Sequence, residues 1–376
     1  MKSARWQLLV GLLVVPAVMM LAGLGAGPAW AGWPQKPITV YVGWSAGGSS
    51  DTTTRALCLQ MEKKLGQKIL VTNVTGALGS IGATQVAKAP ADGYLWFGGA
   101  AVHGTWPILG HSKVSWTNFY AYLTVFFPTT IYVKADSPYK TFADYIAAIK
   151  KAPAGKVFKY GHPGAGSNGA IFAGLVMEAA GVAKKIRSIP YKGGREAGRY
   201  LLSGDVDFVS VTMGDLADWA VAGRIRPLLN LYDRDLVFKG VKFPSVKSLY
   251  PQLLPYQAIN PYFGVYLNRN TPPEILVKVA KAYAWAVKQS DFKKIAVDQR
   301  AGVWAPLLGR ASDEQMSKIE SARGWALYGL GIAKNNPSQF GVPKLENWKW
   351  PPHQRAKNLK PWPKECEEIF KKELAR

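Results

Sequence analysis

The chain has 376 residues, of which 48% are apolar and 19% charged, with two cysteines and four histidines. This apolar share supports a packed core and excludes disordered and low-complexity proteins, while two cysteines exclude a disulfide-framework protein. The formal net charge of +23 favours anionic partners such as small acids. Because the basic residues are spread along the chain, we interpret this charge as a general field.

The first thirty-one residues have the pattern of a signal peptide. Lys2 and Arg5 give a positive start, an uncharged run covers 8–24, and Ala29-Trp30-Ala31 fits a small-x-small cleavage site. An uncleaved membrane anchor is the alternative, but glycines and a proline interrupt the run before the cleavage site. We therefore expect a periplasmic protein, cleaved near Ala31, that binds no nucleic acid.

From Trp33 onward, short β-branched runs alternate with helical stretches, which predicts an α/β fold with mostly parallel sheets. The expected strands are 38–42, 69–74, 95–98, a long extended run at 124–133, 156–160, 187–191, 206–211, 225–231 and 262–267. The expected helices are one stopped by Gly66, then 142–150, 168–180, 196–202, 216–222, 272–287, and a last one that opens on a capping box at 312–315 and ends near Gly329.

The order of these elements predicts two doubly wound α/β domains of the flytrap type. A complete α/β unit lies between two extended segments, so one domain is inserted into another, with strand crossovers near 124–133 and 259–268 as a two-strand hinge. We predict domain I at 32–131 and 260–331 and domain II at 132–259. Residues 332–376 form an atypical, basic C-terminal extension.

Glycines and hydroxyl residues follow the predicted strands directly and open the next helices. Such loops line the ligand crevice of an open α/β sheet, and the four that qualify are Gly47–Asp51, Gly161–Asn168, Lys192–Gly194 and Thr212–Gly214. Their backbone N–H groups and helix dipoles suit a carboxylate, at about 1.5–3 kcal/mol for each charge-assisted hydrogen bond. Ordinary Gly-rich turns are the alternative for any one loop. Four loops at equivalent positions favour a binding site.

The sequence matches the motifs of serine hydrolases and dinucleotide-binding proteins only in part, and it has no metal-binding motif. Gly43-Trp44-Ser45-Ala46-Gly47 matches the nucleophile elbow of serine hydrolases, but it follows the first strand, and the one late histidine lies in the extension. Gly164–Gly169 matches a dinucleotide fingerprint without the acidic residue about twenty positions later. The histidines are scattered without metal-ligand spacing. We therefore expect no catalytic residue, metal or cofactor.

A few single residues keep two readings. His103 and His162 follow strands, so each is either a ligand-facing residue or a satisfied loop histidine. Asp51 is primarily a cap for its helix. Cys58 and Cys366 are either disulfide-bonded or free. The aromatic residues Trp44, Trp106 and Tyr191 are candidates for an apolar pocket wall.

The ordered series of short motifs resembles the Bug receptors, the periplasmic solute-binding proteins of tripartite tricarboxylate transporters. The series begins with Trp33–Ile38 and Gly47–Asp51 and extends over roughly 33–330. It continues through Leu65-Gly66-Gln67, Ala91-Asp92-Gly93-Tyr94, Tyr160-Gly161, Gly164–Ser167, Pro190–Gly194, Gly204–Asp207 and Ala222–Arg226.

The resemblance implies a flytrap receptor that passes small carboxylates to integral membrane transporter subunits. The expected ligand-binding residues are Gly47, Gly48, Ser49, Ser50, Asp51, Ala101, His103, Gly164, Gly166, Ser167, Asn168, Lys192, Gly193, Gly194 and Thr212. Three positions depart from the family pattern, since Ala100-Ala101, Ala170 and Val211 replace polar residues. These departures favour an apolar or aromatic carboxylate over an amino acid or citrate.

We thus expect a non-catalytic, monomeric binding protein that carries a carboxylate in an interdomain cleft to a tripartite tricarboxylate-type transporter. Two alternatives stay open. One is an exported serine hydrolase that uses Ser45, and the other is an orphan ligand sensor that docks on a signalling partner.

Overall fold

A computed structural model describes residues 32–375 of the chain, so the predicted signal peptide lies outside the described residues. The chain divides into a unit that ends at Gln35 and a second unit that begins at Lys36. All of the architecture below belongs to the second unit. None of the helices in the described part is long and apolar enough to cross a bilayer.

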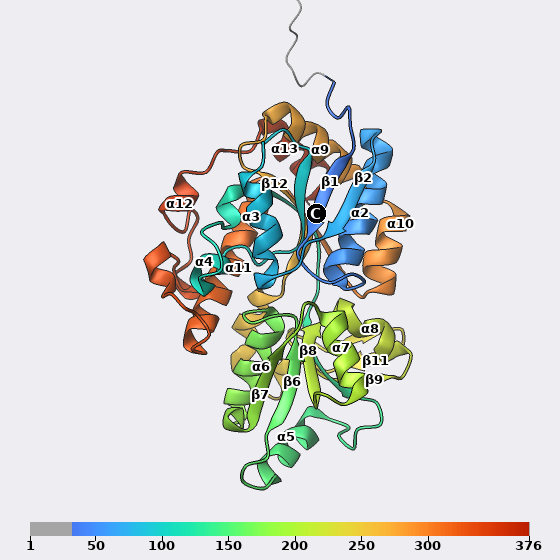
Figure 1. Cartoon of the computed structure of the whole chain (residues 1–376), viewed down its shortest axis with the longest axis vertical. Helices are drawn as coiled ribbons and strands as arrows, with labels where there is room; N and C mark the ends of the chain where they lie inside the picture. Colours follow the sequence, from blue (N-terminus) through green and yellow to red (C-terminus); the bar gives the residue numbers. More distant parts are fainter. Residues whose placement is uncertain (1–31, 376) are drawn as a thin grey trace, which may run out of the picture. The chain divides into compact units, whose positions relative to one another are not determined.

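A six-stranded sheet, in the order β13-β4-β12-β3-β1-β2, forms one half of this unit. Its strands are β1 (Ile38–Val42), β2 (Ile69–Asn73), β3 (Leu95–Ala100), β4 (Phe119–Phe126), β12 (Tyr262–Asn268) and β13 (Val303–Leu307). Its helices are α2 (Ser49–Leu65), α3 (Ser80–Lys88), α4 (Thr105–Leu109), α9 (Pro273–Ala286), α10 (Ser290–Lys293) and α11 (Arg310–Gly329). Helices α2 and α3 cover opposite faces of β1 (Figure 1).

A five-stranded sheet, in the order β7-β6-β8-β5-β9, forms the other half. Its strands are β5 (Thr129–Lys134), β6 (Phe158–His162), β7 (Ile186–Pro190), β8 (Phe208–Thr212) and β9 (Ile225–Asn230). Its helices are α5 (Phe142–Lys151), α6 (Asn168–Ala179), α7 (Gly194–Ser203) and α8 (Met213–Val221), and a small hairpin joins β10 (Leu236–Phe238) to β11 (Val241–Phe243). Helices α6 and α7 lie on opposite sides of β6 (Figure 1).

The α/β class with two sheets joined by two crossovers is confirmed, but the sheets are mixed rather than mostly parallel. Strand β1 pairs in parallel with β2 and β3, whereas β12 and β4 pair antiparallel. In the second sheet β6 pairs in parallel with β7 and β8, and β5 is antiparallel to both of its neighbours. Strands β12 and β5 each enter their sheet from the opposite half, and each is antiparallel to both of its neighbours.

The first crossover divides the long extended segment expected at 124–133 into two strands. Strand β4 ends at Phe126 and β5 begins at Thr129, so Phe127 and Pro128 carry the chain from one sheet to the other. Proline lacks the N–H that a continuous strand would use. Asn260 on the second crossover accepts hydrogen bonds from the Thr129 amide and hydroxyl, both at 2.9 Å, and fastens the two crossovers together.

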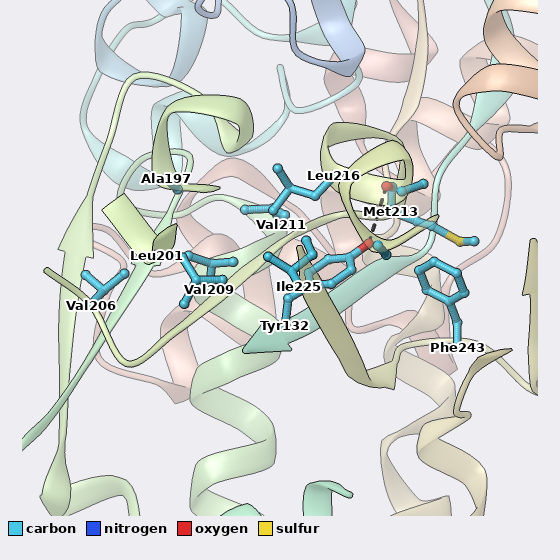
Figure 2. Packing of buried hydrophobic residues seen from close by; sticks show 12 residues of the cluster. Tyr132, Ala197, Leu201, Val206, Val209, Val211, Met213, Leu216, Ile225 and Phe243 are labelled. Carbon is cyan, nitrogen blue, oxygen red and sulfur yellow. Dashed lines mark hydrogen bonds between the residues drawn. The ribbon is translucent and has the colours of Figure 1, made fainter. Parts of the chain in front are cut away.

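The hydrophobic core of the five-stranded half fixes the start of α8. Figure 2 shows Leu201, Val209, Val211 and Leu216 packed around Tyr132 in a cluster that excludes solvent. The Tyr132 hydroxyl donates to the Met213 carbonyl at 3.3 Å. Because Met213 is the first residue of α8, this contact holds the junction between β8 and its helix in place.

The C-terminal extension packs on the six-stranded half through buried polar groups. Its elements are η7 (Pro337–Phe340), η8 (Leu345–Asn347), α12 (Gln354–Lys357), α13 (Lys364–Ile369) and η9 (Phe370–Leu374). Buried Glu320 of α11 contacts His353 at 2.8 Å and Arg355 at 3.0 Å. Burial raises the pKa of Glu320, but these two partners outweigh that effect and leave the pKa below its ordinary value.

Candidate functional site

Four helix starts, one from the six-stranded half and three from the five-stranded half, meet around a small inner cavity of about 30 Å³. The starts belong to α2, α6, α7 and α8, each of which follows a strand or a glycine loop. The cavity is lined by Trp44, Ser45, Gly48, Ser49, Ser50, Ala100, Pro163, Asn168, Gly193, Gly194, Thr212, Asp215 and Phe263. A helix start carries N–H groups without intrahelical partners and a partial positive charge, so a space lined by residues of four helix starts favours an anion.

Several of these amides are available to a ligand. Within the described part of the chain, the backbone N–H groups of Gly48, Ser50, Gly193 and Gly194 have no hydrogen-bond acceptor. Neighbouring amides are engaged, since that of Gly47 donates to Asp51 at 2.9 Å. The inner cavity thus has unused donors from both halves of the molecule.

A carboxylate of the chain itself bridges the two halves at this point. Asp215 Oδ1 accepts from the Ser49 amide at 2.8 Å and from the Ser49 hydroxyl at 2.9 Å. Asp215 Oδ2 accepts from the Thr212 hydroxyl at 2.6 Å. The Asp215 side chain therefore occupies one anion position at the α2 start, where the sequence predicted contact with a ligand carboxylate.

Two glycines allow the halves to approach this closely. A Cβ atom at Gly194 would stand 2.1 Å from Asp215 Oδ2, and one at Gly193 would stand 2.2 Å from Ser45 Oγ. The Ser45 amide also donates to the Lys192 carbonyl at 3.2 Å. The Lys192–Gly194 loop consequently lies against both the Ser45 loop and α8.

An outer cavity of about 400 Å³ adjoins the inner one, because Trp44 and Pro163 line both. Its lining residues are Gly43, Trp44, Gly76, Ala77, Leu78, His111, Pro163, Gly164, Ala165, Pro190, Tyr191, Lys192 and Glu196. Ala77 and Leu78 have positive φ values of 44° and 56° in its wall. Non-glycine residues rarely adopt this conformation, which often marks a functional site.

The structure brings together nine of the fifteen sequence-predicted binding residues. Gly48, Ser49, Ser50, Asn168, Gly193, Gly194 and Thr212 line the inner cavity, and Gly164 and Lys192 line the outer one. The other six, Gly47, Asp51, Ala101, His103, Gly166 and Ser167, line neither cavity. Of the three aromatic residues expected in a pocket wall, Trp44 and Tyr191 line the outer cavity, whereas Trp106 lines neither cavity.

Asp51 and Ser167 instead stabilise the loops themselves. Asp51 accepts from the Gly47 amide at 2.9 Å and from Arg55 at 2.8 Å, as expected of a helix cap. The Ser167 hydroxyl accepts from the Ala170 amide at 3.2 Å and caps α6. The Ala101 amide donates to the Tyr262 carbonyl at 2.7 Å and is part of the strand pairing.

His103 packs in an aromatic cluster and not toward a ligand. Its ring is fully buried, 4.2 Å from the Tyr266 ring centroid and 4.6 Å from that of Trp106. Burial lowers the pKa of His103 to about 3, so the ring is neutral. His162 donates to or accepts from Ser188 at 2.6 Å, and burial lowers its pKa to about 4. Both are satisfied or packed structural histidines.

Buried Arg323 of α11 supports the second glycine loop from beneath. It donates to the Gly166 carbonyl at 2.8 Å and to the Ile259 carbonyl at 3.3 Å. Burial lowers the pKa of Arg323 to about 9. Both acceptors are neutral, so the Arg323 cation adds to the positive potential near the site.

Reasoning from the sequence missed Asp215, which is 166 residues from its Ser49 partner. A signal was present, because Asp215 falls in the first turn of a helix that starts at a candidate loop. The two cysteines are both free and buried. Within residues 32–375 no three His, Cys, Asp or Glu side chains are grouped closely enough to hold a metal ion.

A family model described as "Tripartite tricarboxylate transporter family receptor" matches residues 53–319. The UPF0065 protein in the TAR-I ttuE-ttuC' intergenic region of Agrobacterium vitis is 37% identical over 260 residues, covering 68% of this chain and 72% of that protein.

Solved structures share the fold. The periplasmic binding protein BugD is similar with a TM-score of 0.72 at 23% identity, covering 80% of this chain and 99% of that chain. Rpa4515 of R. palustris, solved with adipate, has a TM-score of 0.70 at 23% identity, covering 80% of this chain and 99% of that chain.

Proposed function

Since the chain belongs to the tripartite tricarboxylate transporter receptor family, we propose that it is a periplasmic solute-binding protein that captures a small carboxylate and delivers it to the membrane subunits of such a transporter. The observation that carries the proposal is the set of unpartnered amides from facing helix starts around the inner cavity. A carboxylate held there gains charge-assisted hydrogen bonds from both halves, which favours their closure.

The two adjoining cavities indicate how such a solute would fit. The inner cavity of about 30 Å³ has room for about two water molecules, hence for a carboxylate group and not for a whole acid of several carbons. The outer cavity, with Trp44, Leu78 and Tyr191 in its wall, suits an apolar or aromatic remainder. The halves would therefore separate at the crossovers to admit the solute and close around it.

The expected division into domain I (32–131 and 260–331) and domain II (132–259) is part of this proposal. The sheet membership of β5 and β12 supports the division, although the first sheet change falls at Phe127 and Pro128. We also propose that the protein acts as a monomer, after cleavage near Ala31. Gly47–Asp51, Gly164–Asn168, Lys192–Gly194 and Thr212 remain the proposed binding segments.

A carboxylate panel tests this function directly. The mature protein is titrated with mono-, di- and aromatic carboxylates, and binding is followed by tryptophan fluorescence, since Trp44 lines both cavities. Saturable binding of one class is the expected result. A protein that binds no carboxylate contradicts the proposal. Genes for one small and one large membrane protein beside this one would support transport over a sensor role.

A serine hydrolase that uses Ser45 has little support from the geometry. The Ser45 hydroxyl is buried and has no hydrogen-bond partner among residues 32–375. His103 is packed in the aromatic cluster, and the His162 ring is hydrogen-bonded to Ser188. A nucleophilic serine needs a base within hydrogen-bond reach.

A further inference from the structure

Asp215 is the only charged side chain among the described residues that line the inner cavity. It is 6% exposed, and its three donors, the Ser49 amide and the hydroxyls of Ser49 and Thr212, are all neutral. No cation donates a hydrogen bond to this carboxylate, although Arg195 donates to the Asp215 backbone carbonyl at 3.0 Å and the charges of Arg300 and Asp215 attract each other through space. Its negative charge faces the space that the unpartnered amides surround.

This position restricts what can lie next to a bound carboxylate. A solute carboxylate on the amides of Ser50 and Gly194 would be close to Asp215, because all three residues line a cavity of about 30 Å³. Two like charges repel strongly in a site that excludes water. A donor group between the two carboxylates removes the conflict, because a hydroxyl or ammonium group can donate to Asp215 while the solute carboxylate accepts from the amides.

We propose that Asp215 is a specificity-determining residue that selects carboxylates with a hydrogen-bond donor on the adjacent carbon, that is, 2-hydroxy or 2-amino acids. The inference rests on the proposed function and defines its substrate class. The cavity is so small that the carbon next to the carboxylate is the part of the solute that faces Asp215. The remainder of the solute extends past Trp44 into the outer cavity.

Asp215 also changes an expectation based on the sequence. Val211 and Ala170 suggested a less polar cleft that disfavours amino acids. Val211 is fully buried in the core of the five-stranded half, and Ala170 is buried within α6. The cleft nevertheless has an acidic side chain. It belongs to Asp215 on α8 and not to a residue of β8.

The test uses two matched series of three acids that differ at one atom or group next to the carboxylate. The small series is propionate, lactate and alanine; the aromatic series is 3-phenylpropionate, 3-phenyllactate and phenylalanine. Calorimetry measures each dissociation constant for the wild type, Asp215→Asn and Asp215→Ala. Asp233→Asn is the matched control, because it removes one acidic charge at an exposed surface position.

In at least one series, the wild type and the Asp233 variant should bind the hydroxy or amino acid at least tenfold more tightly than the unsubstituted acid. Asp215→Ala should reduce that ratio at least tenfold, and Asp215→Asn should reduce the ammonium preference most. Thermal melting confirms that each variant is folded, and Asp215→Asn keeps the side-chain shape if the alanine variant unfolds.

Equal ratios in the wild type and in a folded Asp215 variant would overturn the selectivity while leaving carboxylate capture intact. Tighter wild-type binding of the unsubstituted acids would overturn it as well. A wild-type protein that binds none of the six acids would overturn the selectivity, whereas the proposed function fails only if the protein binds none of the mono-, di- and aromatic carboxylates of the larger panel.

Discussion

Replacing Gly194 with alanine is expected to disrupt closure at the inner cavity without unfolding the protein. The new Cβ would stand 2.1 Å from Asp215 Oδ2 and 2.4 Å from its Cγ, whereas ordinary contact begins at 3.4 Å. Asp215 or the whole loop must therefore withdraw by about 1.3 Å. That shift breaks hydrogen bonds of 2.8 Å to Ser49 and 2.6 Å to Thr212.

The energetic cost falls on the closed form. Each charge-assisted bond contributes about 1.5–3 kcal/mol, and overpacking costs about 1–3 kcal/mol. Because the site can relax in part, we expect Gly194→Ala to lose about 2–4 kcal/mol of binding free energy, which corresponds to a ~30- to ~1,000-fold weaker affinity. The helix itself should not suffer, since alanine is a better helix former than glycine and Gly194 is the first residue of α7.

The assay is calorimetric titration with the tightest acid of the panel, together with thermal melting. Gly329→Ala is the control, because a Cβ at that helical position meets nothing within 4 Å. Its affinity should equal that of the wild type. An affinity of Gly194→Ala within about threefold of the wild type, in a folded protein, would refute the reasoning about the Lys192–Gly194 loop.

Three further predictions concern other parts of the molecule. Ser45→Ala should bind the same acid with a dissociation constant within a few-fold of the wild-type value, because the Ser45 hydroxyl has no partner in the described chain. If the wild type hydrolyses an ester and Ser45→Ala does not, the hydrolase alternative is favoured. Burial lowers the pKa of His103 to about 3 and of His162 to about 4, against 6.5 when exposed. The free energy of unfolding should therefore fall between about pH 6.5 and pH 4, by about 1.4 kcal/mol per pH unit for each ring. His103→Phe should reduce that slope in urea unfolding, and an unchanged slope would contradict the buried neutral ring. Trp362→Ala should lower the free energy of unfolding by about 3–5 kcal/mol, because Trp362 is buried and donates to Asp313 at 3.0 Å. Trp348→Ala should lower it less, because Trp348 is partly exposed. Equal losses for the two variants would argue against a buried extension.

The sequence predicts most elements of the fold because its hydrophobic periods are local. Strand β1 and helix α2 with its Gly66 stop occur as expected, and Gly66 has φ 69°. One expected helix start is wrong. Helix α11 begins at Arg310, and Ser312 donates to the Gly309 carbonyl instead of forming the expected capping box.

The candidate site is predictable in its backbone and less so in its side chains. Glycine and hydroxyl loops mark the helix starts, so Gly48, Ser50 and Gly194 could be identified from the chain alone. The contact of Asp215 with Ser49 depends on how the two halves meet, which no local pattern encodes. The sequence leaves two readings of His103 open for the same reason, because the aromatic cluster around it includes Tyr266 of the distant strand β12.

In the proposed site, backbone amides of facing helix starts hold the solute carboxylate. A crystal structure of the protein with its tightest acid measures this directly. We predict the carboxylate oxygens within hydrogen-bonding distance of the Ser50 and Gly194 amides, with the rest of the solute beside Trp44 in the outer cavity. A solute that lies outside both cavities, or one whose carboxylate contacts neither amide, would contradict the account.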